Sequence, residues 1–155
     1  MLNALKKILK EITVGESDKL TFSPDDERLA TAALMFHLVA IDGDVDDLEQ
    51  KAMRDVLRKS YDIDPEQLEL LIREAKKRDE EAIDLYGFTS LLKRKLDIEG
   101  RLGVVEMLWE MVYADGIVHE FEDNTVWRVA ELLGVSKRER LDIRHRVAAR
   151  VSPQE

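Results

Sequence analysis

An internal repeat restricts the fold of this 155-residue chain more than any other feature of its sequence. Residues 34–43 (LMFHLVAIDG) resemble residues 107–116 (MLWEMVYADG), and Asp115 follows Asp42 by 73 positions. The similarity continues after each Asp-Gly pair through the aligned pairs Val45/Val118, Leu48/Phe121, Glu49/Glu122 and Val56/Val129. Two copies are too few for an open solenoid, in which stacked repeats contact only their neighbours. The repeat therefore predicts two units that are related by a pseudo-twofold axis and share one core.

Apolar residues recur at helical spacing along almost the whole chain, and no alternating strand pattern of useful length interrupts them. N-capping residues and first-position prolines mark the expected helix starts, at Ser23-Pro24, Asp64-Pro65, Asp97 and Ser136. Gly134 is expected to end a helix in the left-handed conformation. The sequence thus predicts an all-α, single compact domain of about seven to eight helices, with helices over 23–41, 82–96, 97–116, 120–133 and 137–151 and others starting near 46 and 65.

The expected domain boundaries follow from this pattern. Residues 1–22 form an amphipathic N-terminal helix and a polar linker, and residues 23–151 form the helical domain. Within the domain, repeat one covers about 29–78, a connecting helix about 82–96, and repeat two about 102–151. The N-terminal helix is expected to dock on the body or on a second chain, with a membrane surface as the alternative. Its apolar residues lie opposite its lysines: Leu2, Leu5, Ile8, Leu9 and Ile12 against Lys6, Lys7 and Lys10.

Helical spacing also predicts core positions. Leu48, Ala52, Val56 and Leu57 fall on one face of the helix that starts near Asp46. Four aromatic residues at core-like spacing are expected to pack the two units together: Phe36, Trp109, Phe121 and Trp127. His37 is interpreted as a core or boundary histidine rather than a metal ligand, because its counterpart in the second repeat is Glu110.

Charge and composition exclude several classes of function. The chain has 24 Lys and Arg against 33 Asp and Glu, which gives a net charge of −9, and it has no cysteine. Nucleic acid is not expected as a partner, because phosphate binding requires a basic face. Disulfide frameworks, thiol nucleophiles and zinc–thiolate sites are excluded. Without a targeting or membrane-spanning segment, the expected location is the cytoplasm, with peripheral attachment to the inner membrane as an alternative.

The acidic pairs in the repeats are the candidate site. Asp42 and Asp115 lie at the carboxyl ends of apolar helices, where the helix dipole disfavours a carboxylate. Glu49 and Glu122 lie in the first turns of the helices that follow. Carboxylates that converge repel each other unless a proton or a cation lies between them. The four acids therefore predict a divalent-cation site. Ca²⁺ is preferred, with Mg²⁺ or Mn²⁺ as alternatives, because all the ligands are oxygens. The competing interpretation is that the acids have turn and cap roles that duplication has kept.

An ordinary EF-hand is excluded even though Asp-Gly-x-Val-x-x-x-Glu matches the second half of its loop. The first two ligand positions would be Leu38 and Ala40 in one unit and Met111 and Tyr113 in the other. These side chains cannot replace aspartate as ligands. A cation would need ligands from both repeats, or backbone carbonyls and water.

The duplicated Asp-Gly-x-x-x-x-x-Glu units resemble the TerB-like family, named for tellurite-resistance protein B. Residues 85–94 (LYGFTSLLKR) and 104–116 (VVEMLWEMVYADG) are similar to its bacterial stand-alone branch. The resemblance implies about seven helices and an association with tellurite and envelope-stress responses. It also implies an acidic site suspected of binding metal, formed here by Asp42, Glu49, Asp115 and Glu122, and it implies no established enzymatic reaction.

The function expected from the sequence is a non-enzymatic cation-binding and protein-interaction module without an organic cofactor. Its expected partners are other proteins, including membrane-associated stress-response components, and a homo-oligomer is an alternative. A second hypothesis is a metal-independent adaptor that uses the basic last helix, residues 137–150, or the N-terminal helix. A third, hydrolysis by a metal-bound water, lacks any substrate-binding motif.

Overall fold

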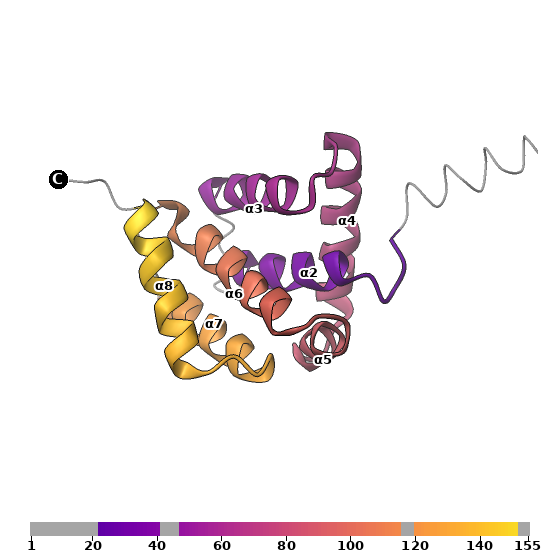
Figure 1. The fold of residues 1–155 in the computed structure, drawn as a ribbon. Helices are drawn as coiled ribbons and strands as arrows, with labels where there is room; N and C mark the ends of the chain where they lie inside the picture. The colour runs from indigo at the N-terminus through magenta and orange to yellow at the C-terminus, as the bar shows by residue number, and fades with distance from the viewer. Residues whose placement is uncertain (1–21, 41–46, 116–119, 152–155) are drawn as a thin grey trace, which may run out of the picture.

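The computed structural model describes residues 22–40, 47–115 and 120–151 of the chain. Within these ranges the chain forms seven α-helices and one short 3₁₀-helix, and no strand (Figure 1). None of the described helices is long and apolar enough to cross a membrane. The all-α prediction is therefore confirmed; the elements are α2 (Glu27–Ala40), α3 (Asp47–Tyr61), α4 (Pro65–Glu81), α5 (Tyr86–Lys95), α6 (Ile98–Val112), η1 (Tyr113–Asp115), α7 (Glu120–Leu132) and α8 (Lys137–Val151).

Helices α2 and α6 form the centre of the molecule. Helix α2 packs against α3, α4 and α5, and helix α6 packs against α3, α7 and α8. Because neighbours surround both helices, apolar side chains cover most of their surfaces rather than a single stripe. Met35 in α2 and Leu108 and Trp109 in α6 are almost completely buried.

Helix α3 joins the two halves of the fold. It contacts α2 and α4 of its own half and also α6 and η1 of the other half. The buried residues consequently form one continuous cluster that includes both halves. This shared core agrees with a single domain, while the pseudo-twofold relation of the two predicted repeats stays a prediction.

Three of the expected helix starts have the predicted caps. The Asp64 carboxylate accepts a hydrogen bond from the Gln67 backbone N–H at 2.8 Å, and Asp97 accepts one from Gly100 at 2.9 Å. At the start of α8, Ser136 Oγ accepts from the Glu139 N–H, while the Glu139 carboxylate accepts from the Ser136 N–H, both at 3.1 Å. This reciprocal pair is a capping box.

The end of α7 also forms as predicted. Gly134 has a φ of 74°, in the left-handed region. Its N–H donates to the Glu131 carbonyl, and the next N–H, of Val135, donates to the Ala130 carbonyl. These two bonds define a Schellman motif, which satisfies carbonyls that the helix leaves open at its end.

Three predicted helix boundaries were wrong. Helix α2 begins at Glu27, because residues 23–26 form a turn and Asp26, not Ser23, caps the helix by accepting from the Arg28 N–H at 2.9 Å. Helix α5 begins at Tyr86 rather than at 82, because α4 extends to Glu81 and a short exposed loop follows. Helix α6 ends at Val112 and tightens into η1, so it does not continue as one α-helix toward residue 116.

Some predicted core positions were also wrong. Trp109 is buried and Phe36 is half-buried, but Trp127 and Phe121 on α7 are 44% and 66% exposed. Trp127 is instead covered on one face by the Arg140 guanidinium, 5.3 Å from the ring centroid. Leu48 is 57% exposed, because the buried face of α3 runs through Glu49, Met53, Val56 and Leu57.

Candidate functional site

Glu49 and Glu122 occupy the same place in two different helices. Each is the third residue of its helix, in α3 and α7 respectively. Both are buried, with exposed fractions of 4% and 3%. The acids that open the same two helices, Asp47 and Glu120, are exposed. The first helical turn favours negative charge because of the helix dipole, but the dipole does not require burial.

Burial distinguishes these two glutamates from ordinary first-turn acids. Taking a carboxylate out of water is costly unless hydrogen bonds, a proton or a cation compensates for the lost hydration. A solvated cap would leave the carboxylate at the surface, as Asp47 and Glu120 do. Their burial thus separates Glu49 and Glu122 from the exposed acids of the same helix turns, while turn and cap chemistry stays the competing interpretation.

The two predicted aspartates are placed only in part. Asp42 lies outside the described residues, and Asp115 closes η1, whose backbone is described. Helix η1 packs against α3, the helix that carries Glu49 (Figure 1). Figure 1 shows the carboxyl end of α6 beside the amino end of α3. The fold thus brings the second Asp-Gly segment to the helix of the first glutamate, as ligands pooled from both repeats would require.

Arg144 of α8 holds both sides of the second Asp-Gly segment. Its Nε donates to the Tyr113 hydroxyl at 3.0 Å, and its Nη1 donates to Asp123 at 2.8 Å. Its guanidinium also lies over the Trp109 ring, 4.9 Å from the centroid. Tyr113 begins η1 and Asp123 directly follows Glu122, so one side chain fixes the segments that enter and leave residues 116–119. Sequence reasoning did not single out this arginine, because the signal was one residue within a basic helix.

A match to a protein-family model shows which family this chain belongs to. The model described as "Tellurite resistance protein TerB" matches residues 28–145. The chain belongs to the TerB family. The match covers the whole helical body from the first turn of α2 into α8, and it includes both Asp-Gly units. The resemblance inferred from those units is confirmed.

A solved structure has the same fold as this TerB-family chain. A protein of unknown function from Porphyromonas gingivalis W83, PG1108, superposes with a TM-score of 0.60 at 20% sequence identity. The match covers 81% of the present chain and 98% of PG1108. At this identity the similarity shows the fold alone. A comparison with curated proteins gives no match.

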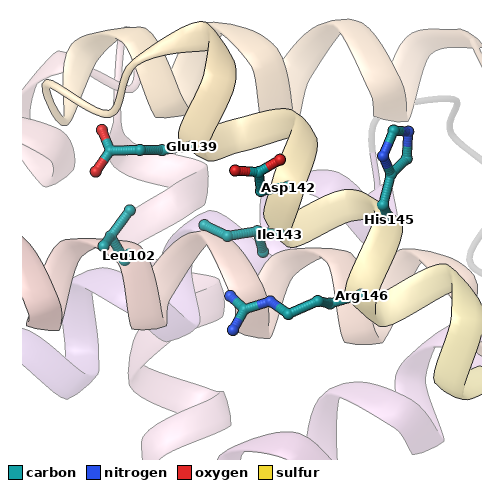
Figure 2. Close-up of a pocket in the computed structure, with 6 residues that line it drawn as sticks. All are labelled: Leu102, Glu139, Asp142, Ile143, His145 and Arg146. Atoms are coloured by element: carbon teal, nitrogen blue, oxygen red, sulfur yellow. The ribbon is translucent and has the colours of Figure 1, made fainter.

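Polar side chains elsewhere in the described part of the TerB-family domain do not gather into a candidate cation site. A surface groove of about 510 Å³ along α8 is lined by Glu139, Asp142 and His145, together with Leu102, Ile143 and Arg146. Figure 2 shows that Glu139 and His145 point to opposite ends of this groove. No group of three or more His, Asp or Glu side chains suited to a metal ion occurs among the described residues. His37 Nδ1 lies 2.9 Å from an Asp79 carboxylate oxygen between α2 and α4, which agrees with a boundary histidine.

Proposed function

We propose that this TerB-family chain is a non-enzymatic module that binds a divalent cation through Asp42, Glu49, Asp115 and Glu122. The observation that carries the proposal is the burial of Glu49 and Glu122 at the same position of α3 and α7. A hard cation compensates buried carboxylates directly and accepts oxygen ligands in irregular geometry. Ca²⁺ is preferred over Mg²⁺, because Mg²⁺ demands near-ideal octahedral geometry and keeps several waters.

Cation binding would act on partners through the surface beside the two glutamates. Leu48 and Phe121 directly precede Glu49 and Glu122 and are the exposed apolar side chains of these helix starts. A cation that draws the two turns together would change how these side chains are presented. We infer a cation-dependent surface for other proteins, including membrane-associated components of a bacterial tellurite or envelope-stress response. The family description supports the tellurite part of this proposal.

Calorimetry on the full chain tests the cation site. Ca²⁺, Mg²⁺ and Mn²⁺ are titrated separately into the wild-type chain and into the variants Glu49→Gln, Glu122→Gln, Asp42→Asn and Asp115→Asn. Binding tighter than about 1 mM is expected for the wild-type chain, as for extracellular calcium modules or better. Each variant is expected to bind at least about tenfold more weakly, because each loses one charged oxygen ligand.

The matched control is Glu120→Gln, which removes a carboxylate from the same turn of α7 but from an exposed position. It should bind the cation like the wild-type chain. The proposed site would be refuted if no cation binds below millimolar concentration. It would also be refuted if Asp42→Asn and Asp115→Asn bind the cation as tightly as the wild-type chain does.

A metal-independent adaptor is the second candidate, and the exposed charges of α8 favour it. Lys137, Arg138 and Arg146 are exposed, although Arg144 and Arg150 are held by acids of the same chain. An exposed basic strip on an acidic protein suits an acidic partner. Partner binding that survives EDTA and is lost in Arg138→Glu/Arg146→Glu would support the adaptor, whereas binding that EDTA abolishes would support the cation-dependent surface.

A further inference from the structure

A groove runs along α6 where this helix meets the start of α2 and the end of α3. Its volume is about 350 Å³. Five lining residues are apolar or glycine, three are acidic and are called the acidic rim here, and Ser60 and Tyr61 complete the lining. The first group is Leu96, Gly100, Gly103, Val104 and Met107, and the acidic rim is Glu27, Glu106 and Glu110. The groove therefore suits a segment that is apolar on one side and basic on the other.

The lining of the groove contains two glycines of α6, which are otherwise unfavourable inside a helix. A Cβ added at Gly100 would lie 3.1 Å from Leu96 Cβ, so a close neighbour accounts for this glycine. A Cβ added at Gly103 would meet no atom within 4 Å. Nothing in the described part of the chain requires glycine at position 103. A flat, side-chain-free surface is what allows another backbone to approach a helix closely.

The acidic rim is only partly neutralised by the body. Arg150 of α8 reaches Glu106 at 3.0 Å and Glu110 at 3.1 Å. One guanidinium thus pairs with two carboxylates, and Glu27 of α2 adds a third acid to the lining. Further cationic side chains would be attracted to this rim.

The described chain begins at the same end of α2 that contributes to this groove. The Phe22 ring lies beneath the Arg28 guanidinium at 4.9 Å and packs against the core, and Glu27 follows five residues later. Residues 13–21, the polar linker, can span up to about 30 Å when extended. A helix over residues 1–12 is about 18 Å long, so it can reach and lie along the 15-residue α6.

We propose that residues 1–12 of the same chain dock in the α6 groove as an amphipathic helix. Its apolar face, from Leu2 to Ile12, lies on the glycine-bearing face of α6, and Lys6, Lys7 and Lys10 reach the acidic rim. The proposal does not depend on the cation site.

Paramagnetic relaxation in the full chain tests this docking. The chain has no cysteine, so Asn3→Cys provides a unique site for a nitroxide label. The amide signals of residues 100–107 are expected to lose most of their intensity in dilute, isotopically labelled protein. Gly103→Leu is expected to abolish the loss, because the leucine fills the groove without meeting any described atom within 4 Å of its Cβ.

The matched control is Gly87→Leu in α5, where an added Cβ also meets nothing within 4 Å. This variant should retain the intensity loss, and circular dichroism should show that both variants remain folded. Lys7→Glu/Lys10→Glu should reduce the loss, because it reverses the charge that faces the acidic rim.

Four results would overturn the proposal. The first is full intensity for residues 100–107 in the labelled wild-type background. The second is a loss that persists in Gly103→Leu. The third is a loss that appears only when spin-labelled, isotopically unlabelled protein is mixed with isotopically labelled protein, which would assign the groove to a second copy. The fourth is found with vesicles of anionic phospholipid. Docking would also be refuted if residues 1–12 bind these vesicles and never contact α6.

Discussion

At the scale of single residues, Arg144 shows how one side chain can hold a segment that is far from it in sequence. Its guanidinium contacts Tyr113, Asp123 and the Trp109 ring, which lie on three successive elements of the second half. Hydrogen bonds to charged groups are stronger than neutral ones, and a stacked guanidinium adds a further contribution. The basic character of α8 is therefore partly structural, and not simply a solvated charged face.

Arg144→Ala is expected to destabilise the fold by about 1–3 kcal/mol, because it removes two hydrogen bonds and a cation–π contact from a half-buried site. Arg146→Ala removes the same charge from an exposed site of the same helix and should change stability by less than about 0.5 kcal/mol. Urea unfolding followed by circular dichroism measures both. Equal effects would mean that α8 acts only through its net charge.

Tyr61 gives the fold a dependence on alkaline pH. Burial at the end of α3 raises the pKa of its hydroxyl from 10.0 to about 12, and the nearby Glu27 and Asp26 carboxylates act in the same direction. Between pH 10 and 12 the folded chain holds this proton while the unfolded chain releases it. Stability should therefore fall as pH rises through that window, by roughly 2–3 kcal/mol at most, since one pKa unit is about 1.4 kcal/mol.

Tyr61→Phe is expected to remove this alkaline loss of stability and the highest step of the tyrosinate absorbance titration. Tyr86→Phe, at a position that is 64% exposed, serves as the control and should leave both in place. A titration in which the highest step survives Tyr61→Phe would contradict the assignment.

At the scale of helices, the same glycine-to-alanine change should have opposite signs at two places. Gly134→Ala places a side chain at a φ of 74° and puts a Cβ 3.1 Å from Arg101 Nη1, which donates to the Leu133 carbonyl. A left-handed alanine costs about 1–2 kcal/mol. Gly87→Ala meets nothing within 4 Å in α5 and should stabilise by up to about 1 kcal/mol. Thermal unfolding of the two variants checks both signs.

Local chemistry explains which elements could be predicted from the sequence. Asp64, Asp97, Ser136 and Gly134 cap or end helices through neighbours within five residues, so the sequence contains the whole interaction. The start of α2 was misassigned because Ser23 and Asp26 are both competent caps, and only tertiary packing selects between them. The exposure of Trp127 was missed because helical spacing shows which residues share a face, but not which face meets another helix.

The candidate site was predictable to the same limited degree. The repeat selected Glu49 and Glu122, and both are buried. Their depth could not be predicted, because burial depends on tertiary packing around two helix starts that are 73 positions apart. Arg144 was missed for the same reason, since its partners belong to three other elements.

At the scale of the whole molecule, the two halves share one core and should unfold together. Leu34 in α2 is 1% exposed, and α2 contacts α6 of the second half. Leu34→Ala is expected to lower stability by about 2–5 kcal/mol. Both tryptophans, Trp109 and Trp127, lie in the second half, so their fluorescence should report this loss in full if unfolding is cooperative.

The control for this experiment is Leu48→Ala, at a position that is 57% exposed, which should change the midpoint little. A fluorescence transition that Leu34→Ala leaves unchanged, while circular dichroism shows an earlier one, would mean that the halves unfold independently.

The loop between α4 and α5 offers a practical handle on this architecture. Ile83 is fully exposed there, while the buried core includes residues of both the helices before this loop and those after it. Exposed loop tips of this kind tolerate nicks and insertions, because few contacts depend on their backbone. The chain could therefore be produced as two separate fragments divided at this loop. If the fold is recovered when the fragments are mixed, the pair can serve as a split reporter.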